Sequence, residues 1–294
     1  MKYIAVTDIG GTTFRSGIYS DTHHKVDISN KDKIRNYQGK NGVLNAIFNQ
    51  INDLIRKNNI SKSNIIGLGL AVPGPLSSEK GIIFDTPNLK IFRNYKIAQD
   101  FTDNLKIKTY IDNDANLFAL GEWHSSYKKN NVFMGVTIGT GLGFGLIING
   151  NLYKGGNGFG LEYGLSPFEW GECEKNVCIG FIRKRAKEIY SKEMRPVIVE
   201  QLYKEGDKNA IKIYHEFGYN LGIVLSHAIN MLDPNVISLG GGLSNAYDCF
   251  KKPMIETLNL YAPSYKTNNI IIKPSKAKEE STMIGASLMI KNLQ

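Results

Sequence analysis

The chain has 294 residues, of which 42% are hydrophobic and 21% charged, which is ordinary for a soluble globular protein and long enough to predict two domains rather than one core. No apolar run reaches the ~20 residues of a membrane span, and the opening MKYIAVTDIGGTT runs straight into Asp8 and glycines, so it predicts a first strand rather than a signal peptide. The net charge of +9 is spread over scattered lysines without helix-turn-helix or zinc-finger spacing, so we expect a cytoplasmic protein that binds neither nucleic acid nor membrane.

The first part of the chain alternates predicted strands and helices. A strand over 3–10, the turn GGTT and a strand over 14–20 predict a hairpin closed around glycines. Apolar spacing predicts a helix over 42–58, and residues 64–76 read as a buried strand that runs into a Pro/Gly loop. A helix near 96–105 then precedes a strand over 108–112, and the segment NDANLFALGEWHSS starts another helix.

The pattern then repeats. Residues 132–150 again read as strand, glycine turn and strand, followed by a long amphipathic helix over 208–231. A buried strand over 235–244 ends in three glycines, and a final helix is expected to begin near Ser281. This alternation predicts an α/β protein, and the two similar openings indicate a duplicated architecture.

Three glycine turns are candidates for phosphate binding: DIGGTT (8–13), IGTGLGFG (138–145) and LGGGLS (239–244). Glycine adopts positive φ and lets a ligand approach the backbone, and successive N–H groups form anion-binding concavities. None of the turns matches a P-loop, and the run at 139–145 continues into a strand rather than a helix, which excludes a dinucleotide-binding fingerprint. Asp8, beside the first turn, is suited to a hydrated Mg²⁺.

The junction YIDNDANLFALGEW has two interpretations. Asp112, Asn113 and Asp114 stand at a strand-to-helix boundary, where Asp and Asn serve as helix caps. Alternatively, Asp114 is a general base that accepts a proton from a substrate hydroxyl, with Asn113 bound to the same substrate. The junction alone favours capping, whereas three phosphate-type turns on the same chain favour the catalytic role.

Taken in order, DIGGTTFRSGIY, GLGLAVPGPL, TPNL, IDNDANLFALGEW, VTIGTGLGFGLIINGNLYKGGNGFGLEYG and LDPNVISLGGGLS resemble the ROK sugar kinases over almost the whole chain. The resemblance implies an α/β two-domain actin-like ATPase fold, which is a duplicated ribonuclease H-like architecture with an interdomain cleft. We place a small N-terminal domain at 1–112 plus 283–294 and a larger one at 113–282. The chain starts at the first phosphate strand, without the DNA-binding segment of ROK repressors, which favours the kinase branch.

The family's roles carry over onto matching positions. The resemblance implies ATP and Mg²⁺ as cofactors, Asp114 as the catalytic base, and Asp8 as a magnesium contact through water. The residues expected to face the phosphates are Asp8, Gly10, Gly11, Thr12 and Thr13 of the first turn and Gly139, Thr140, Gly141 and Gly143 of the second, with Gly240, Gly241 and Gly242 near the adenosine. The residues expected to face the sugar are Gly74, Asn88, Asn113 and Glu162.

The segment LEYGLSPFEWGECEKNVC departs from the family pattern. ROK proteins usually hold a structural zinc with one histidine and three cysteines, but here Leu165 and Gly171 stand at two of these positions. Only Cys173 and Cys178 remain, and a structural zinc needs four ligands. We therefore expect no structural zinc and two free thiols; a disulfide between them and a zinc completed by other ligands are the alternatives.

The same departures bear on the substrate. Leu165 and Gly180 replace a histidine and a glutamate that contact the sugar in the family, so the site has fewer hydrogen-bonding groups. A hexose such as glucose is the first expectation, and an acidic sugar such as 2-keto-3-deoxygluconate, favoured by basic charge near Lys175 and Arg183, is the alternative. A non-catalytic sugar-responsive regulator and a nucleotide-binding module acting on a protein partner are further alternatives. Dimers are common in the family, but the sequence identifies no interface.

Overall fold

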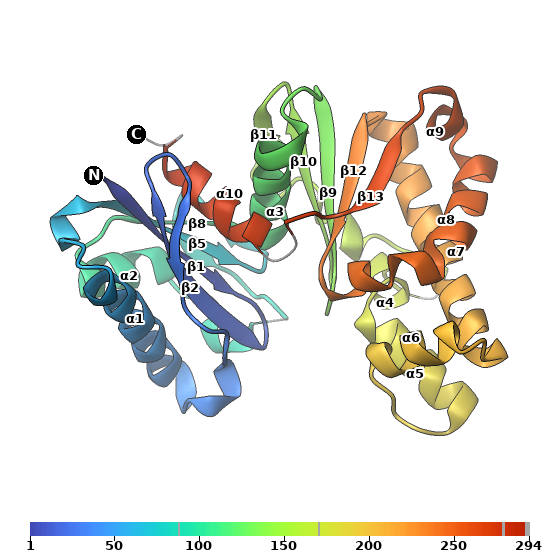
Figure 1. Ribbon diagram of the computed structural model, residues 1–294, viewed down its shortest axis with the longest axis horizontal. Helices are drawn as coiled ribbons and strands as arrows, with labels where there is room; N and C mark the ends of the chain where they lie inside the picture. Colours follow the sequence, from blue (N-terminus) through green and yellow to red (C-terminus); the bar gives the residue numbers. More distant parts are fainter. Residues whose placement is uncertain (88, 170, 278–279, 292–294) are drawn as a thin grey trace. The chain divides into compact units, whose positions relative to one another are not determined.

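A computed structural model describes residues 1–87, 89–169, 171–277 and 280–291 (Figure 1). The chain divides into two compact units. The first comprises Met1–Ser125, Lys154–Gly160 and Glu279–Gln294, and the second comprises Ser126–Tyr153 and Leu161–Lys278. Within the described ranges, none of the helices has both the length and the apolar character that a membrane crossing requires.

The first unit is built on a six-stranded mixed sheet of order β3-β2-β1-β5-β8, with β4 beside β2. β1 runs antiparallel to β2 and parallel to β5, which is parallel to β8. The strands and helices of this unit are β1 (Tyr3–Ile9), β2 (Thr13–Ser20), β3 (Lys25–Ile28), β4 (Asp32–Lys33), α1 (Gly39–Lys57), β5 (Ile65–Val72), β6 (Leu76–Ser77), β7 (Ile82–Ile83), α2 (Ile97–Leu105), β8 (Thr109–Asn113), α3 (Asp114–Glu122) and α10 (Glu280–Lys291).

Both faces of this sheet are buried. Alternate residues of β1 point to opposite sides, so Ala5 and Ile9 join the apolar cluster formed with α1 and α2. Ile4 and Val6 join a second cluster, which includes side chains of α3 and α10. Helices on both faces of a sheet explain why the parallel strand β5 is an almost unbroken apolar run.

The second unit repeats this topology. Its sheet has the order β11-β10-β9-β12-β13, with β9 antiparallel to β10 and parallel to β12. The strand order and directions therefore match those of the first sheet, as the duplicated openings predict. The strands and helices of this unit are β9 (Val132–Ile138), β10 (Leu142–Ile148), β11 (Asn151–Tyr153), α4 (Cys173–Asn176), α5 (Ile179–Tyr190), α6 (Pro196–Lys204), α7 (Lys208–Leu232), β12 (Val236–Gly240), α8 (Tyr247–Tyr261), α9 (Pro263–Thr267) and β13 (Ile271–Pro274).

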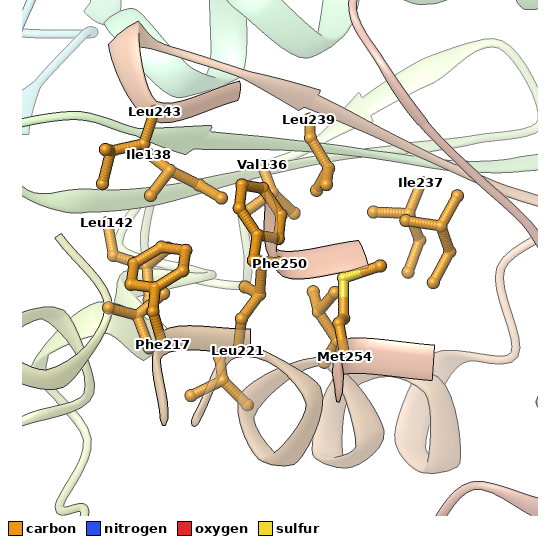
Figure 2. Close-up of a cluster of buried hydrophobic side chains, with 14 of the residues drawn as sticks. Val136, Ile138, Leu142, Phe217, Leu221, Ile237, Leu239, Leu243, Phe250 and Met254 are labelled. Atoms are coloured by element: carbon orange, nitrogen blue, oxygen red, sulfur yellow. The ribbon is translucent and has the colours of Figure 1, made fainter. Parts of the chain in front are cut away.

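Two long helices, α7 and α8, cover one face of the second sheet. Figure 2 shows Phe217 on α7 and Phe250 on α8 beneath the apolar side chains of β9 and β12, with ring centroids 5.1 Å apart. The helices lie close because Gly218 faces the Phe250 carbonyl, where a Cβ atom would come within 2.5 Å of the oxygen. This packing anchors the strands whose ends carry the second and third glycine turns.

The first unit contains α3, which differs from the division at residue 112 expected from the sequence. α3 packs against α10, shown in red beside the blue and cyan strands in Figure 1, and the two backbones approach closely. A Cβ on Gly121 would lie 1.9 Å from the Ser281 carbonyl oxygen, and one on Gly285 would lie 1.8 Å from that of Leu117. These two glycines let α10 hold α3 within the first unit.

Candidate functional site

The carboxyl ends of β1, β5 and β8 form one edge of the first sheet. Asp8 on β1 is in register with Ala71 on β5, which is in register with Asp112 on β8. Gly74 follows β5 at this edge, and Asp114 starts α3 directly after β8. In open α/β sheets, ligands bind outside the carboxyl ends of the strands, so this edge is the candidate site of the first unit; Asn88 lies outside the described residues.

The first glycine turn connects β1 to β2. The Gly10 N–H donates to the Thr13 carbonyl at 2.9 Å, and Gly11 and Thr12 are exposed. Gly10 does not have a positive φ, and a Cβ there would meet only the Thr13 oxygen, at an ordinary 3.6 Å. Neither a positive φ nor close packing within the chain therefore requires glycine at this position.

The second and third glycine turns lie side by side in the second unit. Gly139 donates its N–H to the Gly141 carbonyl at 2.9 Å, and a Cβ on Gly139 would meet nothing within 4 Å. Gly241 has φ +79°, and its Cβ would lie 2.4 Å from the Ile138 carbonyl oxygen. Of the glycines in the three turns, only Gly241 has a positive φ, and ordinary backbone conformations close the other two turns.

The β8–α3 junction places two acceptor side chains at the start of α3. Asn113 is the helix N-cap, and its Oδ1 accepts a hydrogen bond from the Ala115 N–H at 2.8 Å. Asp114 Oδ1 accepts from the same N–H at 2.8 Å. Burial raises the pKa of the Asp114 carboxyl, while this backbone hydrogen bond opposes the rise. Asn113 therefore performs the capping, and Asp114 is a carboxylate whose proton affinity is raised towards that of a useful base.

Asp112 has a role that the sequence analysis did not assign. Its side chain is only 2% exposed, and its Oδ1 accepts from the Asn113 N–H at 2.8 Å and from Asn116 Nδ2 at 3.0 Å. Its Oδ2 forms an ion pair with the ammonium of Lys154. The pair lacks hydrogen-bond geometry at Oδ2, so Lys154 acts there as a charge. Local spacing gives no indication of this partner, because Lys154 lies far along the chain, after β11.

The segment after residue 160 is held by side chains of the second unit. Glu162 opens a short 3-10 helix and is exposed. Gly164 lies against β10, where a Cβ would come within 2.3 Å of the Leu142 carbonyl oxygen. The Tyr163 hydroxyl hydrogen-bonds Nδ1 of His227 on α7. Burial raises the pKa of Tyr163 to about 12, with further contributions from Cys173. Tyr163 thus fixes the turn that carries Glu162.

The residues of this segment do not fit a structural zinc. Leu165, at the position of the family's histidine, is 50% exposed and has no ligating atom. Cys173 and Cys178 are free and buried, and burial raises the pKa of both thiols. Across the described ranges, no group of three or more His, Cys, Asp or Glu side chains is arranged to hold a metal ion.

The ROK family model matches residues 3–293. The chain belongs to the ROK family. This ROK protein is 27% identical to a glucokinase from Halalkalibacterium halodurans, over 98% of this chain and 94% of that protein. It is 26% identical to the xylose repressor of Caldicellulosiruptor bescii, over 86% of this chain and 69% of that protein.

Comparison with solved structures confirms the predicted fold. The structure of a ROK family glucokinase from Streptomyces griseus, in complex with glucose and AMPPNP, aligns with a TM-score of 0.83 at 17% identity. The alignment covers 99% of both chains. At this identity the likeness bears on the fold alone, which is the α/β actin-like ATPase fold of the ROK kinases.

Proposed function

We propose that this ROK protein transfers the γ-phosphoryl group of ATP to a sugar hydroxyl. The observation that carries the proposal is Asp114: it stands at the carboxyl end of β8, the parallel edge strand of the first sheet, and burial raises the pKa of its carboxyl. An alkyl hydroxyl is a poor nucleophile, and a carboxylate that takes its proton during the transfer assists the reaction. The glucokinase relative and the AMPPNP complex of a family member support the same reaction class.

The sugar is assigned to residues near this base. Asn113 uses Oδ1 for capping, so its amide NH₂ is not consumed by the cap and can donate to a sugar hydroxyl. Gly74 follows the neighbouring strand β5, and Glu162 opens the turn fixed by Tyr163. We assign these residues and Asn88 to the sugar by their match to the family motifs, and Asn113 also by its geometry.

The nucleotide is assigned to the glycine turns. Gly10, Gly11, Thr12 and Thr13 offer backbone N–H groups and hydroxyls to phosphate oxygens, and Gly139, Thr140, Gly141 and Gly143 do the same in the second unit. A Cβ on Gly139 would meet nothing within 4 Å, and one on Gly10 would meet only the Thr13 oxygen at 3.6 Å, which supports backbone that a ligand can approach. Gly240, Gly241 and Gly242 are assigned to the adenosine. Asp8 suits a hydrated Mg²⁺, which supplies positive charge to the phosphates when bound.

A neutral hexose such as glucose is the first proposed substrate. The acidic-sugar alternative depends on basic charge near Lys175 and Arg183. Lys175 is ion-paired with Glu172 at 3.0 Å, and Arg183 is exposed on α5. Neither feature adds support for a carboxylate substrate. A sugar-responsive regulator is the second candidate function, favoured by the similarity to a xylose repressor.

The direct test is an ADP-release assay with Mg·ATP and a sugar panel. The panel contains glucose, mannose, fructose, N-acetylglucosamine, N-acetylmannosamine, gluconate and 2-keto-3-deoxygluconate. We expect turnover with at least one neutral hexose. Turnover only with the keto acid would replace the hexose by the acidic sugar. Nucleotide binding without turnover of any sugar would contradict the kinase proposal and favour the regulator.

Treatment with a strong zinc chelator is expected to leave the fold and the turnover unchanged. The physical reason is that Leu165 and Gly171 cannot ligate a metal, while the Tyr163–His227 hydrogen bond fixes the turn instead. Elemental analysis of the purified protein and its melting temperature with and without chelator provide the measurement, with assay Mg²⁺ restored before turnover is recorded. Stoichiometric zinc whose removal lowers the melting temperature would contradict this expectation.

A further inference from the structure

A short glycine loop at 154–160 is closed at its base. The Gly160 N–H donates to the Lys154 carbonyl at 2.8 Å. Gly155 and Gly158 have φ values of +74° and +80°, which side chains rarely adopt. A Cβ on Gly160 would lie 2.7 Å from the Gly155 nitrogen, so the two ends of the loop are in contact. The loop therefore has a defined shape, and its first and last residues lie next to each other.

Two side chains attach this loop to the rest of the first unit. Lys154 forms the ion pair with Asp112 at the end of β8. Phe159 stacks on Phe84, with ring centroids 5.9 Å apart and planes inclined by 19°. Phe84 directly precedes the DTPNL segment at 85–89. The loop is thus fastened both to the strand that leads into Asp114 and to the residue that precedes the DTPNL segment.

The ion pair places a positive charge among acidic groups. Asp112 is almost fully buried, and an unpaired buried carboxylate is strongly unfavourable. Neighbouring β5 contains no ionisable side chain. The other ionisable groups on β8, α3, α2 and α10, and on β1, are Tyr3, Asp8, Asp100, Asp103, Tyr110, Asp114, Glu122, Glu280 and Lys291.

The nearby cations do not replace Lys154. Lys291 ends α10 beside Ile290, which contacts Gly67 near the amino end of β5. Lys108 precedes the first residue of β8 and lies over the Tyr110 ring, 5.1 Å from its centroid. Both are therefore at the opposite edge of the sheet from Asp112. Lys154 is the cation that the structure pairs with Asp112 at the carboxyl edge.

We propose that Lys154 is a positioning residue for phosphoryl transfer: its ammonium balances Asp112 and fixes the glycine loop against the end of β8, next to Asn113 and Asp114. Lys154 acts through Asp112 and is not assigned a contact with substrate. The catalytic consequence rests on the proposed kinase function, whereas the anchoring of the loop does not. Anchoring and catalysis can therefore be tested separately.

The catalytic test is the pH profile of kcat/KM, measured from about pH 5 to about pH 9. A base must be deprotonated, so activity falls as the pH drops through its pKa. In Lys154→Met the unbalanced charge of Asp112 disfavours a second carboxylate at Asp114, which moves the acid limb to higher pH and lowers kcat/KM roughly tenfold to a hundredfold. In Asp112→Asn the unpaired ammonium favours the carboxylate, which moves the acid limb to lower pH.

Two further variants distinguish charge balance from shape. Lys154→Arg keeps the charge and should stay near the wild-type profile. The double variant with Asp112→Asn and Lys154→Met removes both charges and should return the acid limb towards its wild-type position. Lys57→Met is the matched control, because it breaks another ion pair of the first unit, Lys57–Asp27 at 2.8 Å, on the surface. This control should leave the profile unchanged.

Anchoring is measured by hydrogen exchange of a peptide covering 154–160, in the protein without substrate. Lys154→Met should exchange faster than the wild type, and Lys57→Met should not. Unchanged exchange would overturn the anchor, whether or not any sugar is phosphorylated. The positioning role would be overturned if the wild type is active and Lys154→Met exchanges faster at 154–160 but keeps the wild-type acid limb of the kcat/KM profile. If the wild type phosphorylates none of the sugars, the kinase proposal is refuted. The anchoring of the loop is then still decided by hydrogen exchange.

Discussion

Replacing Asp114 by asparagine is expected to lower kcat for sugar phosphorylation by about a hundredfold to ten-thousandfold, which is the usual contribution of a general base. Asparagine is nearly isosteric, and its side-chain oxygen can still accept the hydrogen bond from the Ala115 N–H that Asp114 accepts at 2.8 Å. The fold should therefore survive while the proton acceptor is lost. Steady-state kinetics on the preferred sugar and nucleotide affinity measured by titration are the two readouts.

The matched control for this substitution is Asp248→Asn. Asp248 also lies in the first turn of a helix, α8, but it is exposed and has no proposed role. Both variants lose a favourable charge at a helix N-terminus, which contributes about 0.3–1 kcal/mol to stability. Full turnover in Asp114→Asn would show that another group accepts the proton. Loss of nucleotide affinity together with turnover would show that the substitution acts on the fold.

Gly285→Ala is expected to lower the free energy of unfolding by about 1–3 kcal/mol or more, because α10 would be pushed away from α3. The added Cβ would lie 1.8 Å from the Leu117 carbonyl oxygen, which is backbone and cannot rotate aside. Thermal melting measures the effect, at roughly 2–4 °C for each kcal/mol in a protein of this size. Turnover should fall as well, since α3 begins at Asp114.

A glycine on an open helix face provides the control for Gly285. Gly42 lies in α1, and a Cβ there would meet its nearest atom, in Tyr37, at an ordinary 3.4 Å. Gly42→Ala should be neutral or stabilise by about 0.4–1 kcal/mol, because alanine reduces the entropy of the unfolded chain. Equal melting temperatures for the two variants would show that α3 and α10 do not pack as closely as described.

Local pattern was sufficient for most of the elements. The strand–glycine turn–strand openings became β1–β2 and β9–β10, and the long amphipathic segment became α7. Alternation and helical spacing reflect the faces that each element buries, and this information is local in sequence. Several elements were not predicted, among them α8 and β13 near the end of the chain. Pro253 lies inside α8 and interrupts its helical pattern, and β13 has only four residues, one of them a lysine.

The candidate site was predictable where it follows a strand. Asp8, Asn113 and Asp114 stand at strand ends, so their sequence neighbours already indicate a shared edge. Side chains that reach the site from distant segments could not be predicted from their sequence neighbours. Lys154 reaches Asp112 only through the fold, and His227 reaches Tyr163 from a helix 64 residues away. The domain boundary expected at residue 112 was misplaced for the same reason. The sequence around α3 does not show that this helix packs on α10.

The membership of α10 in the first unit affects how the protein is made. Synthesis proceeds from the N-terminus, and domains generally fold as units as they emerge from the ribosome. Most of the second unit, residues 161–278, is complete before α10 has been translated. Until then Leu117 and the glycine face of α3 lack the contacts that α10 supplies in the finished protein. The nascent first unit is therefore the stage at which chaperone binding or aggregation has most opportunity to compete with folding.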